Sequence, residues 1–270
     1  MASRSGKSLD WSVISAVNNE TVLRSCLLSS PDIQTASEVI LKTGFHSAAA
    51  AYNAGIEKAR SDVLVLVHQD VYLPKGWIDR VWSALELLEA RDPQWAVAGV
   101  WGGKQAGEFT GHLYCSGLMR ILGQPLEAPA EVTSLDEVLL ILRKSSGVRF
   151  DNQLKGFHMY GTDICLEAKA RGLKSYAISA FCIHNTNGYR MLPWDFWKSY
   201  FFLRRKWKAE LPIATSCTEI TLGCWPMLWW NADRLANLLL RRHYSGKRVP
   251  DPKPLYEDLV RSGKVAPATA

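Results

Sequence analysis

The chain contains 270 residues, of which 47% are hydrophobic and 21% are charged. This composition excludes a wholly disordered chain and supports one large domain, or one domain with an appendage, around a substantial apolar core. The formal net charge of +6 is modestly basic, so it fits a phosphate-bearing substrate, a nucleic acid or an anionic membrane surface without choosing among them.

Neither a secretory signal nor a membrane span is expected from the sequence. The first ten residues are polar and Ser-rich, and no run of 18 uncharged apolar residues occurs. The six cysteines form no CxxC pair, which favours buried thiols in a reducing compartment over disulfides or a zinc site. These features predict a cytoplasmic protein.

The first hundred residues alternate between strand and helix patterns. Short apolar runs predict strands at residues 12–17, 38–41, 63–67 and 95–100. Ala-rich or amphipathic segments between them predict helices at residues 20–29, 47–60 and 77–90. After a disordered start at residues 1–10, this order is typical of an α/β domain whose mostly parallel sheet is flanked by helices.

The next eighty residues are less regular. Six glycines between residues 101 and 126 predict loops with short irregular strands. Further strands are predicted at residues 137–143 and 175–180. Between these strands a helix is predicted at residues 162–171, with Thr162 as its cap and Gly172 as the left-handed residue after its end.

Residues 191–270 are predicted to form a helical extension of a domain that spans residues 11–190. Helices are expected at residues 193–208 and 226–242, followed by an irregular Pro- and Lys-rich tail. The second helix starts with tryptophans and has arginines further along, as helices in membrane interfaces do, but core packing or a dimer contact explains this pattern at least as well. No nucleic-acid-binding module is recognisable.

The predicted strand at residues 63–67 ends in a candidate binding site. Its five apolar residues are followed at once by His68, Gln69 and Asp70. Strand alternation places His68 and Asp70 on one side and Gln69 on the other. Ligands of open α/β sheets bind beyond the carboxyl ends of the strands, where an imidazole and a carboxylate can hold a divalent metal or a phosphate. An ordinary turn aspartate explains Asp70 alone equally well.

Two further polar residues are candidates for chemistry. Asp163 lies in the first turn of a predicted helix, where the helix dipole favours an ionised carboxylate that can act as a general base. A capping role also explains Asp163 fully, and spacing alone favours it. His184 follows a predicted strand and can bind a metal as a neutral imidazole, although a single histidine is more often structural.

Five segments in the same order resemble nucleotide-diphospho-sugar glycosyltransferases of the GT-A type, specifically the inverting family 2 enzymes. They are the opening strand Ser12–Asn19, the helical segment Ala51–Ile56, the triplet His68–Asp70 in place of the DxD motif, Gly161–Asp163 in place of the xED motif, and His184. The segments HQDVYLP, TSLDEVLLILRK and GFHMYGTDICL are similar to a bacterial subgroup. The resemblance covers about residues 12–187.

The resemblance implies a GT-A fold, with a nucleotide-sugar half at about residues 11–105 and an acceptor half at about residues 106–190. It implies that Asp163 is the catalytic base of an inverting transfer. It also implies a divalent cation, Mn²⁺ or Mg²⁺, whose ligands would be Asp70, His184 and His68.

Two groups of binding residues follow from the same resemblance. The donor side is expected to contain Ala16, Val17, Asn18, Glu20, Asn53, His68, Gln69 and Asp70. The acceptor or sugar side is expected to contain Asp136, Glu137, Phe157, His158 and Tyr160. The implied partners are a UDP-, GDP- or dTDP-linked sugar and a carbohydrate or lipid-linked acceptor of bacterial polysaccharide or glycoconjugate synthesis, with a peripheral membrane contact through the Trp-rich helix.

The sequence departs from the family pattern at two places. His68 stands where the first acidic residue of the DxD motif is usual, and Leu41–Gly44 lacks the aspartate that often reads the nucleotide base. A catalytically degenerate module that only binds a nucleotide sugar therefore stays open as an alternative. A nucleotidyltransferase fits less well, because Ser12–Asn19 contains no Gly-rich phosphate loop.

Overall fold

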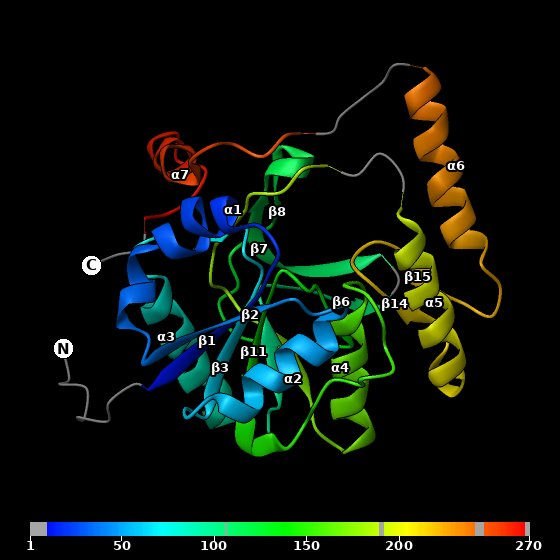
Figure 1. The fold of residues 1–270 in the computed structure, drawn as a ribbon, viewed down its shortest axis with the longest axis horizontal. Coiled ribbons are helices and arrows are strands. Elements are labelled where there is room, and N and C mark those ends of the chain that lie inside the picture. Colours follow the sequence, from blue (N-terminus) through cyan, green and yellow to red (C-terminus); the bar gives the residue numbers. More distant parts are fainter. Residues whose placement is uncertain (1–9, 106, 189–191, 241–245, 268–270) are drawn as a thin grey trace.

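The structure is a computed structural model that describes residues 10–105, 107–188, 192–240 and 246–267. A seven-stranded sheet forms its centre (Figure 1). In spatial order the strands are β2 (Glu38–Thr43), β1 (Trp11–Val17), β3 (Val63–Val67), β11 (Leu139–Arg143), β5 (Val97–Gly99), β12 (Ser175–Ala177) and β9 (Ala130–Val132).

Five of these strands run in the same direction, whereas β11 and β9 run against their neighbours. The expected mostly parallel sheet is therefore confirmed, with β11 inserted in reverse between β3 and β5. The strand before β11 in this sheet is β9, and the segment between them contains the short strand β10 (Ser134–Leu135), which belongs to a second sheet.

Helices cover both faces of this sheet. The helices are α2 (Ala48–Lys58) and α4 (Tyr160–Ala170) on one face, and α1 (Glu20–Ser25) and α3 (Trp77–Arg91) on the other. Alternate residues of β3 join the two cores, with Leu64 and Leu66 on the α2 side and Val65 and Val67 on the α3 side. Burial on both faces is why this strand is apolar without interruption.

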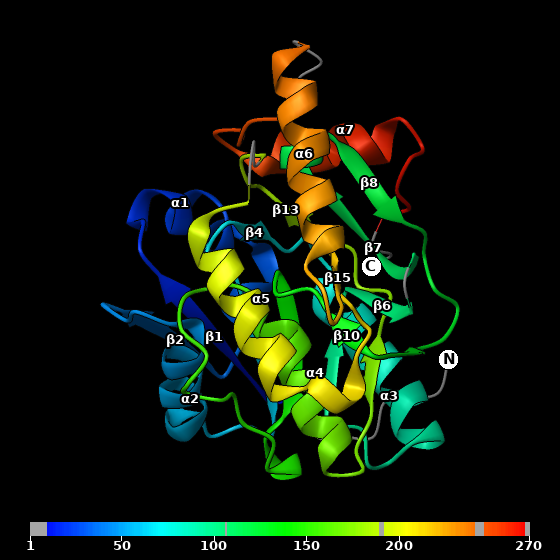
Figure 2. The same cartoon turned by 90° about the vertical axis from the view of Figure 1, so that its right-hand side faces the viewer.

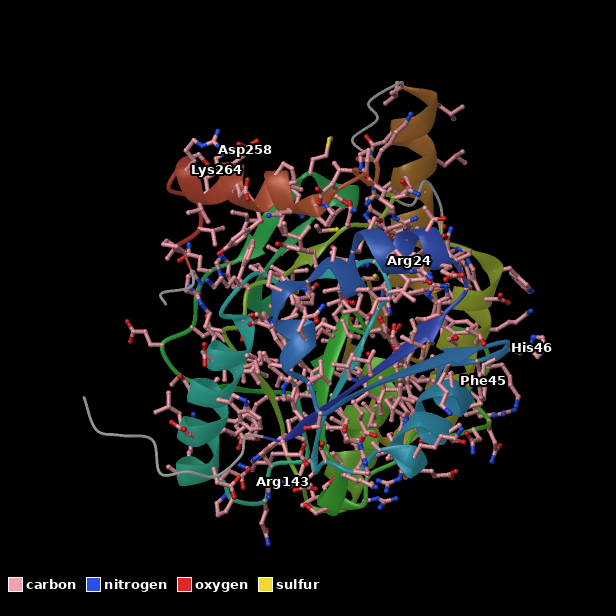
Figure 3. All side chains as sticks on the ribbon, turned by 60° about the vertical axis from the view of Figure 1, so that its left-hand side comes forward. Arg24, Phe45, His46, Arg143, Asp258 and Lys264 are labelled. Atoms are coloured by element: carbon pink, nitrogen blue, oxygen red, sulfur yellow. The ribbon has the colours of Figure 1, made fainter. Side chains whose placement is uncertain are left out.

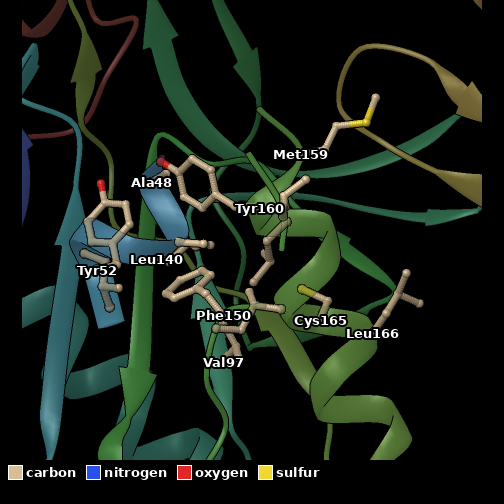
Figure 4. Close-up of a cluster of buried hydrophobic side chains, with 14 of the residues drawn as sticks. Ala48, Tyr52, Val97, Leu140, Phe150, Met159, Tyr160, Cys165 and Leu166 are labelled. Carbon is tan, nitrogen blue, oxygen red and sulfur yellow. The ribbon is translucent and has the colours of Figure 1, made fainter. Parts of the chain in front are cut away.

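The core between α2, α4 and the sheet is rich in aromatic rings (Figure 4). The ring centroids of Tyr52, Phe150 and Tyr160 lie 5.5, 5.7 and 5.8 Å apart in pairs. Gly55 allows α2 to lie directly on β1, because a Cβ there would be 2.3 Å from Ile14 Cγ2. This packing holds the first turn of α4 against the strand ends where the candidate site lies.

A second sheet lies beside the end of β3. It contains β10, β6 (Trp101–Gln105), β7 (Glu108–Cys115), β13 (Ile183–His184) and β4 (Val71–Tyr72), with β8 (Arg120–Gly123) paired to β7. The Gly-rich segment at 101–126, expected to be mainly loops, is therefore largely an antiparallel meander. Its glycines allow close strand packing: Gly111 has a φ of +129°, and a Cβ there would be 2.0 Å from the Val100 oxygen.

The C-terminal extension is helical, as expected. Its elements are α5 (Trp194–Lys206), the small pair β14 (Ile213–Ala214) and β15 (Glu219–Ile220), α6 (Trp225–Leu239) and α7 (Pro252–Arg261). Helix α6 projects beyond the rest of the molecule in two perpendicular views (Figures 1 and 2). None of the described helices is both long and apolar enough to cross a membrane.

Helix α7 corrects the expectation of an irregular tail. Asp251 caps it by accepting a hydrogen bond from the Lys253 N–H, and Pro252 stands at its first position. Its Leu259 packs with Val265 on the second sheet, while Asp258 and Lys264 lie at the outer surface (Figure 3). This helix anchors the end of a segment that crosses the candidate site.

Other boundaries also differ from the sequence prediction. Helix α4 begins at Tyr160 instead of Thr162, because Met159 takes the N-cap position with a left-handed φ of 62°. Gly172 has the expected left-handed backbone, with a φ of +74°. The predicted helix at 20–29 ends at Ser25 and continues as 3₁₀ turns. All six cysteines are free.

Candidate functional site

Three polar side chains converge at the carboxyl end of β3. His68 and Asp70 follow this strand directly, and the pairing of β13 with β4 sets His184 opposite Val71. His184 Nε2 lies 3.5 Å from Asp70 Oδ1, and His68 Nδ1 lies 3.9 Å from the same oxygen. The structure therefore brings together the three residues that the resemblance implied as metal ligands.

Tyr160 fixes the ring of His68 (Figure 4 shows its position in the core). Its hydroxyl donates to the Glu137 carbonyl over 3.1 Å and lies 2.7 Å from His68 Nε2. Since a hydroxyl has one proton to donate, it accepts from His68, which places the ring proton on Nε2. His68 Nδ1 then turns a lone pair toward Asp70 Oδ1. Two acceptor atoms that face each other favour a cation between them.

The charges at this site follow from burial and from mutual contact. Burial lowers the pKa of His68 to about 4, so its ring is neutral near pH 7. Burial also lowers the pKa of His184, but the adjacent Asp70 outweighs this effect and raises the pKa to about 10. For Asp70, burial raises the pKa, and contacts with His184, His68 and Arg248 outweigh it and hold the pKa well below its usual range. Asp70 is therefore an ionised carboxylate.

Arg248 enters the site from the far end of the chain. Its Nη2 lies 2.9 Å from Asp70 Oδ2, and its Nε donates to the Asn185 carbonyl over 2.8 Å. Arg248 was not among the residues expected from the sequence. No local pattern marks it, because it follows Asp70 by 178 residues and stands in a segment that was expected to be irregular.

The donor atoms of His68, Asp70 and His184 fit a divalent cation. Ligand atoms about 2.1 Å from an ion are separated by about 3.0 Å in octahedral and about 3.4 Å in tetrahedral geometry. The three ligand atoms lie within 4.8 Å of one another, so small side-chain adjustments bring them to such separations. Arg248 occupies the other carboxylate oxygen and leaves Oδ1 to the imidazoles.

Asp163 lies in a separate acidic cluster, three residues after Tyr160 on α4. Its side chain has no exposed surface. Lys206 Nζ contacts its two oxygens at 2.8 and 3.0 Å, and the indole N–H of Trp207 donates to Oδ1 over 2.7 Å. Burial raises the pKa of Asp163, although Lys206 and Trp207 oppose the shift. The carboxylate caps no helix end, so the capping explanation does not apply.

Lys206 joins three acidic residues into one network. Besides Asp163, its Nζ lies 2.8 Å from a carboxylate oxygen of both Asp151 and Glu167. Lys206 and Trp207, at the end of α5, both face α4. The ion pairs of Lys206 tie the end of α5 to α4.

The expected donor-side residues lie mainly at the end of β1. Ala16 and Val17 are its last residues, and the backbone N–H groups of Asn18 and Asn19 both donate to Gln69 Oε1. Gln69 thus faces away from Asp70, as strand alternation predicted, and ties the ends of β1 and β3 together. Glu20 is exposed and pairs with Arg24.

Asn53 lies apart from this group. Its side chain donates to the Phe150 carbonyl over 2.8 Å and accepts from the Phe150 N–H over 3.1 Å. Both ends of the amide are therefore used to hold the loop before α4 on helix α2, a structural role that the resemblance did not indicate.

The expected acceptor-side residues are spread over two segments. Asp136 accepts a hydrogen bond from the Val138 N–H, and burial together with Asp136 raises the pKa of Glu137 to about 8. Phe157 is 43% exposed. The His158 ring packs 5.4 Å from that of Phe196 on α5. Tyr160 is buried, and its hydroxyl contacts His68.

Comparison with known proteins shows to which family the sequence belongs. A model described as "Glycosyltransferase like family" matches residues 12–200. The curated protein "ATP synthase subunits region ORF 6" of Fuscovulum blasticum is 32% identical over 134 residues, a match that covers 48% of this chain and 53% of that protein. The chain therefore spans about half the length of this relative.

Solved structures show weaker similarity. Residues 1–349 of S. aureus TarS have 14% identity and a TM-score of 0.43, over 73% of this chain and 65% of that one. GalNAc-T7, solved with UDP, GalNAc and Mn²⁺, has 13% identity and a TM-score of 0.47. This match covers 95% of the present chain and 58% of the GalNAc-T7 chain. Since the family model covers well over half of the sequence, the chain belongs to the glycosyltransferase-like family.

Proposed function

We propose that this protein transfers a sugar from a nucleotide-sugar donor to a hydroxyl group of an acceptor, with inversion at the anomeric carbon. The observation that carries the proposal is the convergence of His68, Asp70 and His184 beyond β3, in a chain of the glycosyltransferase-like family. The donor lies beside the end of β1, at Ala16, Val17 and Asn18, because ligands of open α/β sheets bind beyond the carboxyl ends of the strands.

A divalent cation completes this site. Asp70, His184 and His68 would hold it, and bound there it would neutralise charge on the departing nucleoside diphosphate. Two imidazole nitrogens and one carboxylate suit Mn²⁺ better than Mg²⁺, which prefers oxygen ligands. This chain's own contribution is a ligand set that is already oriented: Tyr160 fixes His68, and the strand pairing of β13 fixes His184.

Asp163 is the proposed base. In the transfer the acceptor oxygen bonds to the anomeric carbon, its proton moves to the Asp163 carboxylate, and the sugar–phosphate bond breaks with its electron pair on the diphosphate. Burial raises the pKa of Asp163, which makes its carboxylate a stronger base for this step. Because Lys206 and Trp207 cover the carboxylate, the end of α5 has to move aside when the acceptor binds.

Asp163→Asn tests this assignment. The variant should bind the donor as the wild type does, while its rate of transfer should fall by a factor of about 10²–10⁴, because positioned proton transfer is lost. The measurement is release of nucleoside diphosphate from UDP-, GDP- and dTDP-sugars with Mn²⁺ and candidate carbohydrate acceptors.

Asp151→Asn and Glu167→Gln are the matched controls. Each removes one ion pair to Lys206, as Asp163→Asn does, but neither removes the proposed base. Both should therefore keep most of the transfer activity. Equal losses in all three variants would show that Asp163 acts only through the ion-pair network.

A binding module without turnover is the second candidate. It is favoured by the pairing of both key carboxylates with cations of the C-terminal extension, Asp70 with Arg248 and Asp163 with Lys206. Such a module should bind a nucleotide sugar and release no nucleoside diphosphate from it, with or without an acceptor. The same assay therefore separates the two functions.

We further propose that α6 makes the peripheral membrane contact. The apolar surface of α5 and α6 exposes 41–74% of each of the side chains Trp194, Phe201, Leu222, Trp225, Leu228, Trp229, Leu235, Leu239 and Leu240. Five of them, Trp225, Leu228, Trp229, Leu235 and Leu239, belong to α6 and fall within an arc of about 120° at 3.6 residues per turn, so they form one stripe. A 15-residue amphipathic helix with such a stripe is suited to lie in the interface instead of crossing the bilayer.

A further inference from the structure

A short strap between α6 and α7 carries Arg248 into the candidate site. The strap, residues 246–249, docks on the loops that follow β7 and β13. The Gly246 N–H donates to the Gly117 carbonyl over 2.9 Å, and the Gly246 carbonyl accepts from the Gly188 N–H over 3.0 Å. A Cβ at Gly246 would be 1.8 Å from the Ser116 oxygen, so the backbone approaches as closely as glycine allows.

Asn185 holds the other end of the strap. Its buried side chain donates to the Val249 carbonyl over 2.8 Å and accepts from the Val249 N–H over 2.9 Å. The Arg248 N–H donates to Asn187 Oδ1 over 2.9 Å. Hydrogen bonds at Gly246 and Val249 fix the backbone on both sides of Arg248. Two of the residues that hold this backbone, Asn185 and Asn187, lie just after His184 in the sequence.

The guanidinium of Arg248 is only partly used by the protein. Nε donates to the Asn185 carbonyl, and Nη2 donates to Asp70 Oδ2. Within the described ranges Nη1 has no hydrogen-bond partner, and 29% of the side chain is exposed. A guanidinium has five N–H groups in a rigid fork, which matches the oxygens of a phosphate. Unused donors beside a cation site are therefore placed to meet a phosphate group.

Arg248 does not compete with the cation for the same atom. It contacts Asp70 Oδ2, whereas His68 and His184 face Oδ1. One carboxylate can therefore hold a divalent cation on one oxygen and orient the guanidinium with the other. Two positive groups side by side would complement the negative charges of a diphosphate.

We propose that Arg248 binds the diphosphate of the donor beside the cation, so that the C-terminal strap completes the donor site. This inference rests on the proposed function. It adds a residue outside the span that the family model matches, residues 12–200.

Calorimetric titration of the full-length protein with UDP, GDP and dTDP in the presence of Mn²⁺ tests the proposal. Arg248→Gln should weaken binding of the preferred nucleoside diphosphate by about 10- to 100-fold, the range for loss of charge-assisted hydrogen bonds. Binding of the corresponding nucleoside, which has no phosphate, should not change. Lys247→Gln is the matched control, because Lys247 is the exposed neighbour in the same strap and has the same charge.

The possible outcomes distinguish a failure of the proposed role of Arg248 from a failure of the proposed function. If the wild type binds no nucleoside diphosphate, the proposed function and the role of Arg248 both fail. If the wild type binds one and Arg248→Gln binds it equally well, Arg248 has a structural role only. Tighter binding by Arg248→Gln would also overturn the proposal, since it would show that the guanidinium blocks the site. Thermal melts of both variants show whether the fold is retained.

Discussion

Tyr160 illustrates how one residue sets the chemistry of another. Its hydroxyl lies beside the Glu137 carbonyl, His68 Nε2 and the Tyr52 hydroxyl, and it has one proton to donate, which the carbonyl accepts. The donation to Glu137 leaves the Nδ1 lone pair of His68 free toward Asp70. Residues that orient a metal-binding histidine are worth about 10- to 100-fold in metal affinity.

Tyr160→Phe is therefore expected to weaken Mn²⁺ binding by about 10- to 100-fold, as measured by calorimetric titration. The ring keeps its place in the aromatic core, but the hydrogen bond to His68 is lost. Tyr200→Phe is the control, because Tyr200 is buried in the same core and its hydroxyl donates to the Gly223 carbonyl instead of contacting His68. Unchanged affinity in Tyr160→Phe would mean that His68 is not a ligand.

At the scale of elements, Lys206 fastens α5 to α4. It is the shared cation of Asp151, Asp163 and Glu167. Burial lowers the pKa of Lys206, and its three acidic partners outweigh that effect and raise it. A buried ion network of this kind is costly to break from one side, because the remaining charges lose their partner.

Lys206→Met should lower the free energy of unfolding by about 3–5 kcal/mol, measured by urea denaturation. The loss should be larger at pH 8 than at pH 5. Burial already raises the pKa of Asp163, and without Lys206 it rises further, so the folded variant binds more protons than the unfolded chain and loses stability as the pH rises. Arg205→Met, at the exposed neighbouring position, should have little effect at either pH.

The elements differ in how far the sequence reveals them. Strand β3 and helix α3 were predictable because each has an apolar pattern with a clear period. The antiparallel strands at residues 101–126 were not predictable, because a segment whose glycines allow close strand packing has the same Gly-rich composition as a loop. Helix α7 had a usable signal that composition obscured: Asp251 before Pro252, with Leu255 and Leu259 four residues apart.

The residues of the candidate site also differ in how far the sequence reveals them. His68, Asp70 and His184 each follow a predictable strand, and the motif order of the family indicated all three. Arg248 and Lys206 could not be predicted as partners of Asp70 and Asp163, because ion pairs between distant segments leave no periodic pattern in the sequence. The hydrogen bonds of Asn53 to Phe150 could not be predicted either, because they arise only in the folded chain, and its contact with the donor stays a prediction.

For the whole molecule, the extension after residue 190 supplies three things to the main domain. It covers Asp163 through α5, brings Arg248 to Asp70 through the strap, and carries the apolar surface of α5 and α6. Helix α6 projects beyond the rest of the fold (Figure 2), and the side chains of its apolar stripe are exposed to solvent.

The protein is accordingly expected to co-sediment with anionic liposomes. Replacing Trp225 and Trp229 with serine should release most of it to the supernatant, because both side chains are at least 66% exposed and belong to the stripe. Leu87→Ser is the control, since Leu87 is 53% exposed on α3, away from that surface. A wild type that stays in the supernatant and forms a dimer through α6 would contradict the membrane contact.

The central claim is that the cluster of His68, Asp70 and His184 holds the cation through which the donor diphosphate binds. Calorimetric titration of nucleoside diphosphates into the wild type and Asp70→Asn, each with and without Mn²⁺, tests it most directly. One nucleotide should bind the wild type only when Mn²⁺ is present, and Asp70→Asn should abolish the effect of the metal. Binding that is equally strong without Mn²⁺, or unchanged in Asp70→Asn, would contradict the claim.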